Sequence, residues 1–162
     1  MFKNIRHSSS GITLVEITIL VVVLGIISAM AVPGFQRVME KLKLSSAARD
    51  IVSDLRWARS EAISSRTQIG VYFNEIAKTY TLFVDINNPA GFTYTPGLDS
   101  VVKVSNYSNL GAASSTFTND TIIFKTDGSS NNSGQFTCAT PDSYHSRTVD
   151  VLSSTGRIKL IS

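Results

Sequence analysis

The sequence has little of the chemistry that most enzymes and metal proteins need. Cys138 is the single cysteine, and the two histidines are His7 and His145, so neither an intramolecular disulfide nor a Cys/His zinc cluster can be built. No glycine-rich phosphate loop occurs, and no pair of carboxylates or nucleophile with its base can be assembled. The sequence therefore predicts a protein that is not an enzyme and has no cofactor and no metal site.

Charge is scarce as well, and it is unevenly placed. Charged residues make up 17% of the 162, and Glu16 is the only ionisable residue between positions 12 and 32. The distal half is instead rich in Ser, Thr and Asn. A chain of this length holds one domain with a hydrophobic core and one appended segment, so we expect one head and one anchor.

A short basic segment precedes the apolar one. Residues 1–11 contain Lys3 and Arg6 and end in Ser-Ser-Ser-Gly, and residues 12–32 are apolar over about 21 positions, enough to span roughly 30 Å of hydrocarbon as a helix. A secretory signal peptide is cut after its apolar region, whereas the polar leader here comes before it, so the apolar helix is expected to remain in the mature protein. The basic residues predict a cytoplasmic N-terminus and an exported head.

Glu16 is the exception within the apolar run. An acid inside a spanning helix costs about 2.5 kcal/mol or more unless it is paired or lies near the membrane surface. Two interpretations are therefore open, namely solvation close to the interface and pairing with a positive group of another subunit.

The segment Gly11-Ile12-Thr13-Leu14-Val15-Glu16 resembles the type IV prepilin signature, and Pro33 stands where that family has a helix-kinking proline. The resemblance implies that a prepilin peptidase cuts between Gly11 and Ile12 and that Ile12, in place of the usual Phe, is N-methylated. The ammonium group created at Ile12 would lie among apolar helices. Glu16 of a neighbouring subunit can pair with it during assembly, and a desolvated pair of this kind enforces register.

An amphipathic pattern follows Pro33 and predicts that the helix continues to about residue 66. Its apolar positions recur at intervals of three and four: Phe35, Val38, Met39, Leu42, Ile51, Val52, Leu55, Ala58, Ala62 and Ile63. Arg59 and Arg66 come near the helix end, where positive charge is favourable. The string Ala58-Arg59-Ser60-Glu61-Ala62 with Leu55 is similar to the signature of GspH/FimT-type minor pilins and pseudopilins.

After residue 67 the pattern favours strands. β-Branched and aromatic runs occur at 69–73, 80–86, 101–104, 121–125, 135–138, 148–152 and 157–161. Cys138 is expected to be a small apolar strand residue. The polar segment 127–134 is typical of a hairpin loop, and the loops 87–100 and 105–120 are the segments most open to partner contact, although exported heads also tolerate such loops.

The predicted fold is α+β: a leader over 1–11, a transmembrane helix over 12–32, an amphipathic helix over 33–66, and a β-rich head over 67–162. The head is an antiparallel sheet packed on the helix, the ladle shape that the resemblance also implies. The expected location is the bacterial inner membrane, with the N-terminus cytoplasmic and the head periplasmic, and then the assembled filament. The expected partners are other pilins or pseudopilins, the prepilin peptidase and the membrane.

Three functions are compatible with these features. The first is a minor subunit of a type IV pilus that primes assembly, and the second is the H-type minor pseudopilin of type II secretion. The third is DNA binding for natural transformation, because Gly156-Arg157-Ile158-Lys159 resembles a Gly-Arg-x-Arg motif in DNA-uptake members of the subfamily. Alternation places Arg157 and Lys159 on one face of a strand, with Arg147 as a third basic residue that could stand beside them. The same charges would also protect an edge strand from aggregation.

Overall fold

The computed structural model describes residues 11–108 and 110–161. The predicted leader, with His7, lies outside the described residues apart from Gly11. The helix α1 spans Leu14–Ser65, and a short 3-10 helix, η1, spans Thr118–Asp120. The strands are β1 (Ile69–Asn74), β2 (Thr79–Val84), β3 (Ser100–Asn106), β4 (Ala113–Ser115), β5 (Thr121–Phe124), β6 (Gly134–Ala139), β7 (Ser146–Leu152) and β8 (Arg157–Ile161). The chain divides into two compact units, Met1–Met39 and Glu40–Ser162, and each is described by itself.

The second unit is built on one face of α1. The buried helix residues are spaced by three and four, as a core-facing stripe requires: Leu44, Ala48, Ile51, Val52, Leu55, Ala58 and Ala62. The apolar face predicted from the sequence was wrong at its ends, because Phe35, Val38, Leu42 and Ile63 are exposed. Leu42 and Leu44 are about 200° apart around a helix, so only one of them can face the core.

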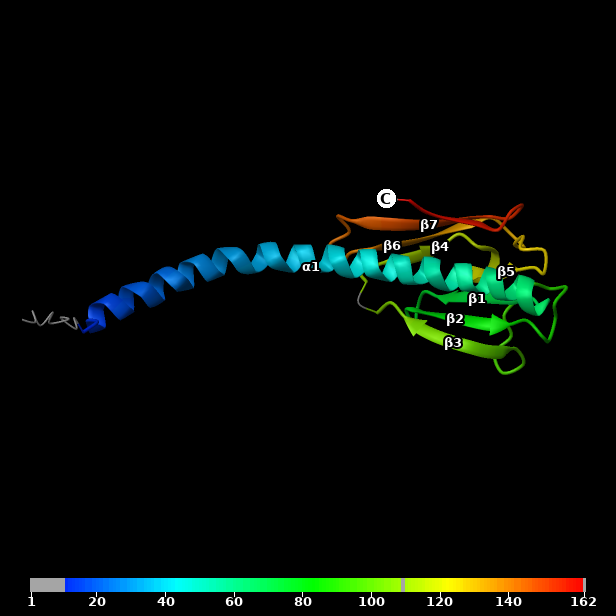
Figure 1. The fold of residues 1–162 in the computed structure, drawn as a ribbon, viewed down its shortest axis with the longest axis horizontal. Helices are drawn as coiled ribbons and strands as arrows, with labels where there is room; N and C mark the ends of the chain where they lie inside the picture. Colours follow the sequence, from blue (N-terminus) through cyan, green and yellow to red (C-terminus); the bar gives the residue numbers. More distant parts are fainter. Residues whose placement is uncertain (1–10, 109, 162) are drawn as a thin grey trace, which may run out of the picture. The chain divides into compact units, whose positions relative to one another are not determined.

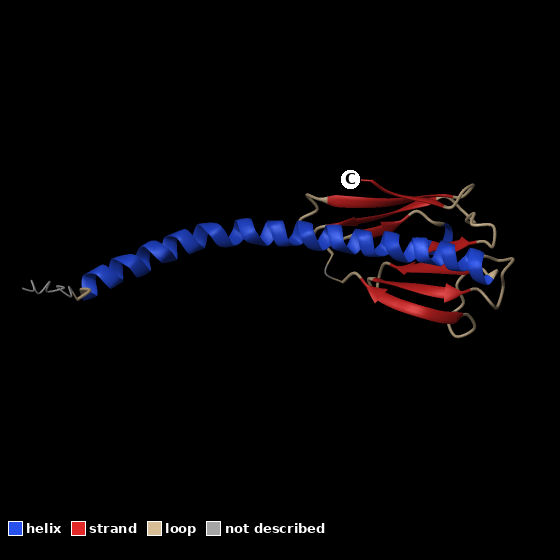
Figure 2. Ribbon diagram, viewed as in Figure 1, coloured by secondary structure: helices blue, strands red, loops and turns tan. Residues whose placement is uncertain are grey.

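Two antiparallel four-stranded sheets pack on this helix face, one in the order β3-β2-β1-β5 and the other in the order β4-β6-β7-β8. Within this unit, β1–β3 lie to one side of α1 and β6 and β7 to the other (Figure 1), and the helix runs along both layers (Figure 2). The sheets meet at Phe73 and Phe136, whose rings stack at 4.4 Å. The predicted α+β fold, with one long helix packed on antiparallel strands, is confirmed.

The seven predicted strands are all present, with ends shifted by no more than about two residues, but the predicted connections differ in two places. The segment 127–134 is not a hairpin loop, because β5 pairs with β1 and β6 pairs with β4 and β7. It carries the chain from one sheet to the other. The strand β4 was missed, since three small residues, Ala-Ser-Ser, show no strand pattern.

The two polar loops are packed more tightly than their composition suggests. The loop after β2 is held by Asp99, and its Tyr94 stacks on Tyr72 at 5.2 Å and contacts Phe83 at 4.7 Å. In the segment 105–120, Tyr107 and Leu110 between β3 and β4 and Phe117 after β4 are buried in the core. Large parts of both loops therefore serve the head's own packing.

The strand β3 forms an edge of its sheet and is exposed along its whole length except for half-buried Ser105. Its register on β2 shifts between Leu82 and Phe83, where Lys103 and Val101 are the respective partners, so that Val102 forms a bulge. Lys103 turns to the helix and forms an ion pair with Asp54 at 2.7 Å.

The stacking of Phe73 on Phe136 leads to a stability prediction. Phe136→Ala should lower the free energy of unfolding by about 3–5 kcal/mol, because it removes a fully buried ring and leaves a cavity between the sheets. Ile76→Ala, at a side chain that is 99% exposed, is the control and should stay within about 0.5 kcal/mol of wild type. Urea denaturation of the full-length chain in detergent measures both. Equal stability of the two variants would contradict the assignment of this contact.

Candidate functional site

The start of α1 is fixed by a local cap. Gly11, Ile12 and Thr13 precede the helix, and the Thr13 hydroxyl accepts a hydrogen bond from the backbone N–H of Glu16 at 3.2 Å. This is the arrangement of a helix N-cap, with the acid three residues later. Glu16 thus lies in the first turn, where a negative charge also interacts favourably with the helix dipole.

The apolar half of α1 is exposed on all sides in the isolated chain. Ile12, Leu14 and Val15 are 69%, 83% and 65% exposed, and the residues through Val32 are likewise exposed. The helix is long and apolar enough to cross a membrane. The helical backbone continues without interruption through position 33. A helix that is apolar on every face needs lipid or other apolar helices around it.

The residues of the Ala58 to Ala62 signature divide between core and surface. Leu55, Ala58 and Ala62 are fully buried, whereas Ser60 is exposed and Glu61 is half-buried. The small alanines allow the sheets to approach the helix closely. This part of the signature therefore has a structural role within the head.

Arg59 connects the helix to two distant turns. Its Nε donates a hydrogen bond to the carbonyl oxygen of Gly128 at 2.9 Å, which differs from the helix-end role predicted for it. Gly156 lies against the same groups, because a Cβ at position 156 would clash with the Gly128 carbonyl and come within 2.9 Å of Arg59 Nε. Gly156 also has a φ of +60°. The glycine of the predicted Gly-Arg-x-Lys motif is thus required by the fold.

The basic residues of β8 do share a face, but Arg147 is not beside them. Arg157 and Lys159 are exposed, and they alternate with the inward-facing Ile158. Lys159 lies directly opposite Asp150 of β7, which brings a carboxylate to the same outer face. Thr148 of β7 lies on the face of Arg157 and Lys159, so its neighbour Arg147 points to the opposite face of the sheet. Arg147 also lies at the other end of β7 from Leu152, the residue that pairs with Arg157. The prediction that Arg147 could join them was wrong.

Two other arginines are nearer to Arg157. A cleft of about 560 Å³ between α1 and the β7–β8 turn is lined by Arg56, Arg59 and Arg157, with Leu152, Thr155 and Ile158 completing it. None of the lining residues is acidic. The sequence did not indicate Arg56 as a site residue, because no local pattern shows that this turn of the helix lies against the last hairpin.

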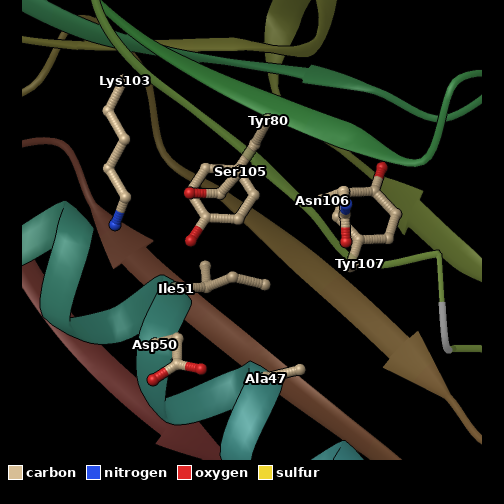
Figure 3. A pocket seen from close by; sticks show the side chains of 8 residues that line it. All are labelled: Ala47, Asp50, Ile51, Tyr80, Lys103, Ser105, Asn106 and Tyr107. Atoms are coloured by element: carbon tan, nitrogen blue, oxygen red, sulfur yellow. The ribbon is translucent and has the colours of Figure 1, made fainter.

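A second cleft, of about 330 Å³, opens between α1 and β3. Figure 3 shows Ala47 and Asp50 of the helix facing Tyr80, Lys103 and Ser105 of the sheet. The Tyr80 hydroxyl donates to Asp54 Oδ2 at 2.7 Å, and the same carboxylate accepts from Lys103. Burial, followed by the bond to Asp54, raises the pKa of Tyr80 above its ordinary range. These contacts fasten the edge of the sheet to the helix.

The remaining candidates for chemistry lie apart from one another. Burial raises the pKa of the Cys138 thiol to about 11, so it is a protonated core side chain, as predicted. His145 is exposed in the turn before β7, and its backbone pairs with Thr140. Within residues 11–108 and 110–161, no three His, Cys, Asp or Glu side chains gather as metal ligands would.

A family model described as type II transport protein GspH matches residues 47–155, about two thirds of the chain. The chain belongs to the GspH family. The match begins in the buried stripe of α1 and ends directly before Gly156, so it covers the signature and most of both sheets.

Individual relatives of the GspH-family chain include both pilus and secretion proteins. The pilin-like protein PilA1 of Thermus thermophilus is 36% identical over 88 residues, which are 54% of each chain, so this chain spans about half the length of that relative. The solved type IV minor pilin FimU of Pseudomonas aeruginosa has a TM-score of 0.58 at 20% identity, over 76% of this chain and 91% of that one. The minor pseudopilin EpsH from the type 2 secretion system of Vibrio cholerae has a TM-score of 0.57 at 11% identity, over 74% and 97%.

These findings confirm the predicted family. As a member of this family, the chain is a type IV pilin-like protein, and its fold is that of solved minor pilins and pseudopilins. Proteins of this family are structural filament subunits, so the chain is not an enzyme. The family and the one apolar helix together indicate membrane anchoring.

The junction of Arg59 with two turns of the GspH-family chain leads to a second prediction. Gly156→Ala should destabilise the chain by about 2–4 kcal/mol, because it combines a left-handed φ with a clash against the Gly128 carbonyl. Gly97→Ala is a matched control, since Gly97 has a φ of +82° but open space around its Cβ, and it should cost only about 1–2 kcal/mol. Thermal unfolding followed by circular dichroism compares them. Equal losses would show that the contact with Gly128 contributes nothing.

Proposed function

We propose that this chain is a minor pilin of a type IV pilus, a structural subunit that primes filament assembly. The observation that carries the proposal is the apolar first half of α1, which is exposed on all sides and has Glu16 in its first turn. A subunit with this helix can be placed only among lipids or among the same helices of other subunits. The 36% identity to a protein named pilin-like favours the pilus.

We infer that assembly begins with processing. A prepilin peptidase cuts between Gly11 and Ile12, both of which are exposed and precede the first helical residue, so the peptide bond is accessible. Ile12 is then N-methylated, the N-terminus lies at the cytoplasmic side of the inner membrane, and the head lies in the periplasm. The mature chain would consist of the membrane helix over 12–32, the amphipathic helix over 33–66 and the head over 67–162. Pro33, at the boundary of the two helical parts, would allow a change of direction between them.

Glu16 then has two roles that do not conflict. Its backbone N–H is capped by Thr13 within the chain, and in the filament its carboxylate faces the ammonium group of Ile12 on a neighbouring subunit. In an apolar filament core such a pair is desolvated, and removing one partner leaves a buried charge that costs about 3–5 kcal/mol. Correct placement of each subunit is thereby favoured over a shifted one.

Replacing the chromosomal gene tests this function. Glu16→Ala should be processed normally but should lower surface pili roughly tenfold or more, since each 1.4 kcal/mol changes an equilibrium about tenfold. Exoprotein release should stay unchanged. Immunoblots for processing, electron microscopy of pili and assays of secreted protein give the three measurements.

The controls separate processing from assembly. Glu40→Ala makes the same change on the same helix beyond the apolar half and should leave pili intact, whereas Gly11→Ala should accumulate uncut precursor. Normal pili with Glu16→Ala would remove the pairing argument. Loss of secretion with intact pili would instead assign the chain to type II secretion, as an H-type minor pseudopilin.

The arginine-lined cleft favours a second candidate function, contact with DNA during uptake. Arg56 of α1 and Arg157 of β8 line one cleft that has no acidic lining residue, so together with Arg59 they could reach two or three phosphates. Lys159 contributes less, because Asp150 lies opposite it. Net charge gives little help: without Lys3 and Arg6 the formal charge of +3 falls to about +1.

Fluorescence anisotropy with duplex DNA at two salt concentrations tests the cleft. The full-length chain in detergent should bind weakly, and the double variant Arg56→Gln/Arg157→Gln should reduce the slope of log affinity against log salt by about two. Arg147→Gln is the matched control, because the same change on the other face of the sheet should leave binding unaltered. The proposal that the cleft contacts DNA is wrong if the wild-type chain does not bind duplex DNA at low salt, or if the double variant binds it equally well.

A further inference from the structure

Gln68 and Asp85 lie opposite each other at one end of the β1–β2 pair. Ile69 pairs with Val84, and the backbone N–H of Asp85 donates to the carbonyl oxygen of Gln68 at 3.0 Å, which extends the pairing by one residue. Because side chains alternate along a strand, Gln68 and Asp85 share the face opposite to that of buried Ile69. This is the face over which the loop 86–98 folds with Tyr94.

Both side chains present buried acceptor oxygens that lack a well-formed hydrogen bond; the backbone N–H of Asn88 comes near Asp85 but does not satisfy its carboxylate. Gln68 Oε1 and the two carboxylate oxygens of Asp85 are buried without a hydrogen-bond partner, and they are three of the four such side-chain atoms within the described residues. Asp85 is only 5% exposed. Buried polar atoms normally have partners, and unpaired acceptors gathered at one place indicate a missing positive group.

A second buried carboxylate stands at the other end of the same loop. Asp99 is 6% exposed, and its Oδ1 accepts from the backbone N–H groups of Ile86 and Asn87, while Oδ2 accepts from that of Thr95 at 2.7 Å. These bonds hold the carboxylate against the backbone of the two residues that follow Asp85. Each of its oxygens still has a lone pair for a further partner.

Within residues 11–108 and 110–161, no basic side chain forms an ion pair with either acid. Burial, and after it the charge of Asp99, raises the pKa of Asp85, and the backbone N–H of Asn88 lowers that pKa only in part. Lys125 comes to the loop but lies 5.2 Å from the ring centre of Phe92. Its charge is not among those acting on Asp85. The cluster thus has an excess of negative charge and of acceptors.

We propose that Asp85, Asp99 and Gln68 bind a calcium ion that ties together the two ends of the loop 86–98. Carboxylate and amide oxygens without His or Cys are the donors that a hard cation prefers, and Ca²⁺ accepts six to eight of them in irregular geometry, with backbone carbonyls and water supplying the rest. Two carboxylates and one amide give a weak site, with a Kd on the order of 10⁻⁴ to 10⁻³ M.

Calcium-dependent thermal stability tests the site directly. In detergent at pH 7, the full-length chain should unfold about 3–6 °C higher with calcium at roughly ten times its Kd than with EGTA. Asp85→Asn should abolish this shift and should be no less stable than wild type in EGTA, because it removes a buried charge without changing shape. Asp127→Asn makes the same replacement at an exposed loop aspartate and should keep the full shift.

Gln68→Glu provides a second, independent variant. A third carboxylate should strengthen calcium binding roughly tenfold and should lower the melting temperature in EGTA. The proposal is wrong if calcium leaves wild type unchanged, which would mean that a proton neutralises Asp85. It is equally wrong if Asp85→Asn keeps the calcium shift, or if magnesium produces the same shift as calcium.

Discussion

The stripe of residues on α1 from Leu44 to Ala62 is the surface on which the rest of the head depends. It is the common wall of two sheets, and three of its members are alanines, which let both sheets come close to the helix axis. A larger side chain at Ala58 or Ala62 would separate the helix from a sheet. The family signature is therefore explained first by packing. Arg59 adds a hydrogen bond to Gly128 of the crossing segment, and Gly156 of the last hairpin packs against the same two groups.

The two halves of α1 have side-chain patterns that suit different surroundings. The second half has one buried stripe and a mostly polar remainder, with Leu42, Trp57 and Ile63 as exposed apolar exceptions. The first half has apolar side chains on every side and one acid in its first turn. One continuous helix thus carries two kinds of contact, and only the contacts of the second half are completed within the chain.

Much of this organisation could be predicted from the sequence, because it rests on local patterns. Runs of β-branched and aromatic residues located seven strands, and apolar residues spaced by three and four located the helix. The strand-like residues around Cys138 indicated that its side chain is buried. What the sequence could not supply depends on distant pairing. The position of Arg147 on the opposite face from Arg157, the proximity of Arg56 to the last turn and the role of residues 127–134 as a crossing between sheets follow from register and topology. Leu42 and Leu44 show the same limit within a helix, since both are apolar and only the sheets decide between them.

The bulge at Val102 affects whether the edge strands of neighbouring heads can pair with each other. A filament presents its subunits at high local concentration, and β3 is an edge strand with exposed Val101, Val102 and Val104. A regular edge of this composition would accept a strand from any neighbour. The bulge breaks the row of backbone N–H and C=O groups near its middle, and Lys103 is drawn inward to Asp54 at that point. The bulge and the inward-turned Lys103 thereby disfavour the addition of a further strand at this edge of the head.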